Sequence, residues 1–226
     1  HICIDHQGCL KLKKEIYAFC DEHNGSLPPL QIQYADFALW QSRNKSRDEA
    51  KVLQWWHEKL STAPQVLQLP LDRERVPQHK SSCGLLNVCI ESSYGRNMSL
   101  LASQEGVTLN SWLLTTWAQT LLQLNKQEMV VIGLPHSVQA QSMELFDLIG
   151  CFATPVPVGV PRPASEATFC IWLHDIFREL LLALQHADVP LFSIVQTLKP
   201  TRSHMHNALF QVSCTLSNTF DSPTSP

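Results

Sequence analysis

The stretch Thr108–Leu134 reads TLNSWLLTTWAQTLLQLNKQEMVVIGL and decides the fold class. Thr108 is a good helix N-cap, because its side-chain oxygen can accept a hydrogen bond from the first helical turn. We expect this helix to run to about Asn125 and to direct one apolar face inward, formed by Leu109, Leu113, Trp117, Leu121 and Leu124. The continuous apolar run Met129–Leu134 predicts a buried strand. A helix followed directly by a buried strand is typical of α/β layers.

The segments on both sides of this stretch also alternate between helical and extended patterns. Apolar spacing predicts helices at about 8–23, 34–60 (one long helix or a pair), 97–105, 165–184 and 190–198, and strands at 85–91 and 210–217. Within 34–60 the candidate inward residues are Phe37, Trp40, Leu53, Trp56 and Leu60. Four prolines in 155–163 predict an extended edge or crossing segment. Ser165 is the candidate cap of the helix that follows.

Composition limits the class of protein. With 226 residues, 44% of them hydrophobic, the chain can bury a substantial core. A formal net charge of -3 gives no electrostatic reason to expect a nucleic acid or an anionic membrane as partner. There is no apolar run of membrane-spanning length and no leader pattern, so we expect a cytoplasmic protein. The chain starts with His1 and ends in a polar, proline-rich segment typical of a linker, which suggests a piece of a longer polypeptide.

The eight cysteines include no CxxC pair, which argues against a zinc knuckle or a redox dithiol. Cys89 and Cys170 stand inside apolar patterns, so buried, reduced thiols that pack as small hydrophobic groups are predicted. His204 and His206 have the spacing of a metal-ligand pair, but the sequence places no third ligand beside them. We therefore predict no metal site.

The first five residues, His1-Ile2-Cys3-Ile4-Asp5, form an HxxxD pattern. A histidine can accept a proton from a nucleophile near neutral pH, and a nearby carboxylate can fix the geometry around it. The spacing alone fits a second interpretation at least as well, namely a surface histidine followed by an aspartate that caps the next helix. The remaining motifs of the chain are needed to decide between the two.

Several further stretches resemble, in order and spacing, the condensation domains of nonribosomal peptide synthetases. LPPLQIQYADFALW at 27–40 resembles the family's LPPLPIQYADYAVW, and VVIGLP at 130–135 is similar to its IVVGTP. LIGCFAT at 148–154 resembles LIGFFVNT, HADVPLF at 186–192 resembles HQDVPFE, and TRSHMHNALFQV at 201–212 resembles RSLSRNPLFQV. The segment from Trp55 to Arg73 resembles YWxxxLxxAPxxLxLPxDR. The resemblance covers His1 to about Asn218, and the ordered set is far more specific than any single motif.

This resemblance implies a fold and an activity. The family fold is α/β, with two chloramphenicol-acetyltransferase-like lobes around a tunnel, of which this chain would supply mainly the C-terminal lobe. Residues 1–218 would be a partial condensation domain and 219–226 a linker. Donor and acceptor peptidyl carrier proteins would insert phosphopantetheine arms, and the domain would join their aminoacyl or peptidyl thioesters by a peptide bond. An adenylation domain would be adjacent, and the domain itself would bind no cofactor.

The resemblance also implies site residues. The second histidine of the family's HHxxxDG motif corresponds to His1, and its aspartate to Asp5. His1 would position or deprotonate the acceptor amine and help to stabilise the tetrahedral intermediate. Asp5, the second residue of the catalytic motif, would have a structural role, paired with an arginine of the other lobe. The candidate substrate-binding residues are His6, Gly150, Phe152 and Thr154.

Departures from the family pattern leave alternatives open. His6 replaces the motif glycine and could narrow the tunnel, since glycine permits close approach. The other departures are Thr154, Ser193, His206 and Ala208. They make a non-catalytic scaffold domain the main alternative. An epimerisation-type sibling and a free-standing acyltransferase that uses coenzyme A are further alternatives, against which the 27–40 stretch and the carrier-linked motifs respectively argue. We expect the 226 residues alone to be inactive.

Overall fold

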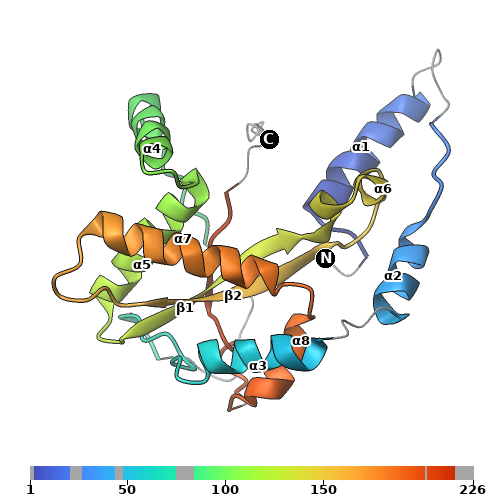
Figure 1. Cartoon of the computed structure of the whole chain (residues 1–226). Helices are drawn as coiled ribbons and strands as arrows, with labels where there is room; N and C mark the ends of the chain where they lie inside the picture. The colour runs from blue at the N-terminus through green and yellow to red at the C-terminus, as the bar shows by residue number, and fades with distance from the viewer. Residues whose placement is uncertain (1–2, 21–26, 44–47, 75–83, 202, 217–226) are drawn as a thin grey trace.

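The computed structural model of the protein describes residues 3–20, 27–43, 48–74, 84–201 and 203–216 (Figure 1). The N-terminal part is helical and comprises α1 (His6–Cys20), α2 (Tyr34–Arg43), α3 (Glu49–Leu60), α4 (Ser92–Gln104) and α5 (Leu109–Leu124). The remaining elements are β1 (Met129–Ser137), the short 3₁₀ helix η1 (Val138–Gln141), α6 (Met143–Phe146), β2 (Ala153–Pro161), α7 (Phe169–Gln185), α8 (Leu191–Leu198) and β3 (Val212–Ser213). Helices and strands alternate over the second half, which confirms the α/β class.

The described sheet has three strands in the order β2-β1-β3. β1 and β2 are antiparallel, with Met129 opposite Pro161 and Ser137 opposite Ala153, and β3 runs parallel to β1. Figure 1 shows α7 crossing the β1–β2 pair, while the far ends of both strands extend beyond it toward α1 and α6. The prediction of an extended edge segment at 155–163 is confirmed, because β2 is an edge strand.

The main core packs helices α3, α5, α7 and α8 against the sheet. Its most deeply buried large side chains include Trp56, Leu114, Leu121, Ile132, Ile176 and Ile194. On β2, the valines at 156, 158 and 160 are each at most 2% exposed and belong to this core. No helix within the described ranges is long and apolar enough to cross a lipid bilayer.

Helix α5 begins where the sequence predicted, but its buried face is a different one. The Thr108 side chain accepts a hydrogen bond from the Ser111 amide, which confirms the cap. Among the predicted inward residues Leu121 is buried, whereas Trp117 and Leu124 are exposed. The buried face consists of Ser111, Leu114, Thr115, Ala118, Leu121 and Leu122. Small residues let the helix lie close to the sheet, and the Thr115 hydroxyl donates to the Ser111 carbonyl, so its polar atom is satisfied within the helix.

Other details of the predictions hold only in part. The 34–60 segment forms the pair α2 and α3, one of the two predicted alternatives, but Trp40 is 58% exposed instead of inward. Helix α7 is capped by Thr168, whose side chain accepts from the Ile171 amide, and not by Ser165. Residues 84–90 are highly exposed and form no strand in the described structure, because an apolar pattern alone does not supply a hydrogen-bonding neighbour. β3 is shorter than the predicted strand at 210–217.

The prediction of buried cysteines is wrong for most of those described. Cys3, Cys9, Cys20, Cys89 and Cys170 are exposed, and Cys151 and Cys214 are half-buried. None of these seven thiols is part of a disulfide. An apolar sequence pattern shows that neighbouring residues are hydrophobic, but it does not show which side of the segment is covered.

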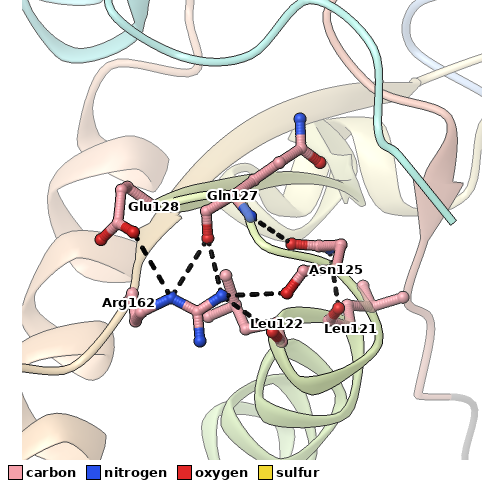
Figure 2. Close-up of polar contacts among 6 residues, drawn as sticks. All are labelled: Leu121, Leu122, Asn125, Gln127, Glu128 and Arg162. Carbon is pink, nitrogen blue, oxygen red and sulfur yellow. Dashed lines mark hydrogen bonds and ion pairs between the residues drawn. The ribbon is translucent and has the colours of Figure 1, made fainter.

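Arg162, just after β2, binds carbonyl groups at the C-terminal end of α5 (Figure 2). Its guanidinium Nη2 donates to the carbonyl oxygens of Leu122, Asn125 and Gln127 at 2.8, 3.1 and 2.9 Å. Its backbone amide donates to the Glu128 carbonyl at 2.7 Å. Carbonyl groups in the last helical turn have no partner within the helix, and a cation at that end interacts favourably with the helix dipole. Arg162 therefore fixes the helix relative to both β1 and β2.

Replacing Arg162 with alanine is expected to lower the free energy of unfolding by about 2 kcal/mol, because several carbonyl oxygens lose a charged donor. Arg162→Lys should recover part of this loss, since lysine keeps the charge but not the planar fork of donors. The measurement is urea unfolding followed by circular dichroism. Arg178→Ala is the matched control, because Arg178 pairs with Asp175 on the surface with its side chain 68% exposed, and it should change stability little. Equal losses for both variants would contradict the assigned role.

Candidate active site at the HxxxD segment

Asp5 anchors the HxxxD segment to the loop before β2. Its side chain is buried, and Oδ1 accepts a hydrogen bond from the Gly8 amide at 2.8 Å, so Asp5 caps α1. Oδ2 accepts from the amides of Phe152 and Ala153 at 2.9 and 3.1 Å. The Asp5 amide in turn donates to the Gly150 carbonyl at 3.0 Å. Two segments 147 residues apart in the sequence are thus joined through one carboxylate.

Two glycines make this close approach possible. A Cβ atom on Gly8 would lie 2.6 Å from Ile4 Cγ1 and 3.1 Å from the Gly150 carbonyl oxygen. A Cβ atom on Gly150 would collide with the ring of Tyr34. Both positions therefore need a residue without a side chain.

An aromatic cluster completes the support of the loop before β2. The rings of Tyr34 and Phe152 pack edge to face with centroids 5.1 Å apart, and Phe37 contacts Phe152 at 4.9 Å. The Tyr34 hydroxyl donates to the Cys151 carbonyl at 3.0 Å, and burial raises the pKa of that hydroxyl. Edge-to-face aromatic pairs add stability beyond the area they bury. The 27–40 and 148–154 stretches, which were singled out separately in the sequence, therefore form one structure.

The structure brings most of the predicted site residues together. Asp5, Gly150 and Phe152 are in direct contact through the hydrogen bonds above. Thr154 is the second residue of β2 and is half-buried. His6 is the first residue of α1 and its side chain is exposed. His1 lies outside the described residues, so the structure does not place it.

Sequence reasoning missed three residues at this site. Gly8 provides the close approach that was expected at position 6, and a glycine three residues after the capping aspartate was the available signal. Tyr34 lies within the 27–40 motif, which carries no signal of its hydrogen bond to the Cys151 carbonyl. His136, on β1 opposite Thr154, is half-buried, and burial lowers the pKa of its imidazole. Within the described ranges, no group of three or more His, Cys, Asp or Glu side chains is arranged to hold a metal ion.

Comparison with known proteins identifies the family. The family model described as "Condensation domain" matches residues 1–225. The chain belongs to the condensation-domain family. The condensation-domain motifs recognised in the sequence are therefore parts of a single family pattern that spans the chain.

The segments that match this chain are parts of much longer synthetases. The condensation-domain chain is 34% identical over 197 residues to malpinin synthetase of Mortierella alpina, matching 86% of this chain and 2% of that protein. It is 32% identical over 196 residues to phosphinothricin tripeptide synthetase PhsB of Streptomyces viridochromogenes, matching 87% of this chain and 16% of that protein. The chain thus spans only a small part of the length of these relatives.

Solved structures show the same fold. The X-domain from teicoplanin biosynthesis superposes with a TM-score of 0.82 at 22% identity, over 93% of this chain and 49% of that one. A four-domain nonribosomal peptide synthetase bound to AMP and glycine gives a TM-score of 0.86 at 19% identity, over 96% of this chain and 16% of that one. The expected chloramphenicol-acetyltransferase-like condensation-domain fold is confirmed, and the chain spans about half of the X-domain.

Proposed function

We propose that this chain is the second part of a condensation domain that joins two carrier-bound thioesters by a peptide bond. The complete domain would include a preceding lobe, since the chain spans about half of the X-domain structure. Residues 1–218 would belong to the domain, and 219–226 would lead to the next one. Donor and acceptor carrier proteins and an adenylation domain are the proposed partners, and the phosphopantetheine arms arrive with the substrates.

The chemistry is an acyl transfer from sulfur to nitrogen. The amine of the acceptor aminoacyl thioester attacks the donor thioester carbonyl, the new carbon–nitrogen bond forms, and the carbon–sulfur bond then breaks. His1 accepts the proton that the amine loses, and this proton leaves with the donor thiol. Asp5 does not act as an acid or base in this proposal, because both of its oxygens are used by backbone amides.

One observation carries the proposal. The Asp5 carboxylate binds the amides of Phe152 and Ala153 and so fixes the HxxxD segment to the 148–154 stretch. These are the two stretches that the family resemblance assigns to the reaction tunnel. A catalytic histidine needs a rigid support to stay within hydrogen-bond reach of its substrate. The anchored loop supplies such a support.

The test is peptide-bond formation by the complete domain, with a donor carrier bearing an aminoacyl thioester and an acceptor carrier bearing another. We expect a dipeptidyl thioester on the acceptor carrier, detected by mass spectrometry. Loss of the donor group to water alone would contradict the proposal. Exchange of the donor α-hydrogen with solvent, without transfer, would favour epimerisation. Residues 1–226 alone should give no product, and turnover at the full rate would refute the two-lobe arrangement.

A non-catalytic scaffold is the second candidate function, favoured by the histidine at the motif glycine position. We expect His6→Gly to change the condensation rate of the complete domain little. The ring is exposed on the first turn of α1, and the close backbone approach occurs at Gly8 instead. His6→Ala is the matched control, because it removes the ring without the helix penalty of glycine, about 1 kcal/mol. A large gain in rate for both variants would show that the ring obstructs the tunnel.

A further inference from the structure

The ends of β1 and β2 beside the HxxxD segment carry a polar pair, which consists of Thr154 from the 148–154 stretch and of His136, a residue outside the family motifs. The Ala153 amide donates to Asp5 Oδ2, and the next residue, Thr154, is the register partner of His136. Partners in an antiparallel pair point to the same face, with Cβ atoms about 4.5–5.5 Å apart. His136 and Thr154 therefore lie side by side. Thr154 directly follows Ala153, whose amide binds Asp5 of the HxxxD segment.

The same face of the two strands is apolar up to this pair. Val158 pairs with Ile132 and Val156 with Leu134, and all four side chains are buried. His136 and Thr154 continue this row but are only half-buried. Figure 1 shows the corresponding strand ends extending past α7 toward α1. The paired side chains thus change from apolar to polar where the two strands extend past α7 and approach the HxxxD segment.

We propose that His136 is a substrate-contacting residue, which with Thr154 hydrogen-bonds the aminoacyl or peptidyl group presented beside the HxxxD segment. This inference rests on the proposed function, because it assumes that a carrier-bound acyl group reaches this place. A neutral imidazole offers one donor and one acceptor, and a threonine hydroxyl offers both as well. An aminoacyl or peptidyl group presents carbonyl oxygens and N–H groups that match them.

Desolvation by burial lowers the pKa of the His136 imidazole and therefore favours its neutral form. A neutral ring can hydrogen-bond a polar group of the substrate without placing a charge in this half-buried position. Its role is binding and selection among acyl groups, whereas proton transfer belongs to His1.

The first test measures KM and kcat of the complete domain for a series of donor and acceptor thioesters. His136→Val should raise KM for at least one of the two substrates by about three- to tenfold, the value of one hydrogen bond, and leave kcat little changed. His136→Asn should restore part of the loss, because the amide again offers a donor and an acceptor. His57→Asn is the matched control, since His57 is exposed on α3, and it should change neither constant. An unchanged KM for every thioester, or an equal fall in kcat and stability, would overturn the inference.

A second test needs neither a substitution nor turnover. Carbethoxylation of the histidines by diethyl pyrocarbonate is followed by mass spectrometry, with and without a saturating aminoacyl pantetheine in which an amide replaces the thioester. We expect slower modification of His136 and an unchanged rate at His57. Equal rates of His136 modification with and without the analogue would refute the contact. Protection without peptide-bond formation by the same domain would support the contact and refute the proposed function, so the two failures are distinguishable.

Discussion

Asp5→Ala is expected to lower the free energy of unfolding of the complete domain by about 3–5 kcal/mol, because three amide donors, two of them in buried hydrogen bonds, lose their acceptor together. The amides are those of Gly8, Phe152 and Ala153, and Asp5 is 3% exposed, so water has little access to the position of the carboxylate. Loss of the cap of α1 contributes to the same change. Thermal and urea unfolding measure it.

Two further variants separate this effect from the loss of a charge. Asp5→Asn keeps one oxygen but turns an NH₂ group toward amide donors, so its stability should lie between those of the wild type and Asp5→Ala. Asp36 is the matched control, because it accepts one backbone bond, from Gln33 at 2.8 Å, on the exposed surface of α2. Asp36→Ala should cost about 1 kcal/mol. If Asp5→Ala unfolds like the wild type but abolishes activity, Asp5 has a catalytic role and the structural assignment is wrong.

The sequence predicted the layers of the fold well, and the structure shows why. Thr108 before a helix and the unbroken apolar run of β1 are local signals, and both features are where they were expected. The buried face of α5 was not predictable from hydrophobicity, because Ser111, Thr115 and Ala118 are buried for their small size while Trp117 is exposed. Such a choice depends on how closely the helix lies to the sheet, which no single segment encodes.

The candidate site was predictable in its parts but not in its assembly. The HxxxD pattern left open whether Asp5 caps a helix or supports a catalytic histidine, and the structure shows capping together with an anchor to residues 150–153. These bonds join positions about 147 residues apart, so their pairing could not be read from spacing. His136 was missed for the same reason, since its importance comes from the register that sets it opposite Thr154.

His1→Ala is expected to lower the condensation rate of the complete domain by about 10²–10⁴-fold, the usual cost of losing a general base. The free energy of unfolding should stay near the wild-type value, because the anchor of the HxxxD segment is Asp5 and its bonds go to backbone amides that the substitution leaves in place. The measurement is a single-turnover assay with preloaded donor and acceptor carriers, which reports the transfer step without carrier reloading.

The contrast between the two motif residues is the sharpest outcome. His1→Ala should reduce the rate of transfer and leave stability intact, whereas Asp5→Ala should reduce stability first and activity as its consequence. Loading of the two carriers, measured by mass spectrometry before mixing, is the control that assigns any loss to the condensation step. If His1→Ala retains most of the rate in a domain of unchanged stability, the histidine does not move the proton. The scaffold alternative is excluded by the same result, because a transfer reaction would still be taking place, and a group other than His1 must then accept the proton.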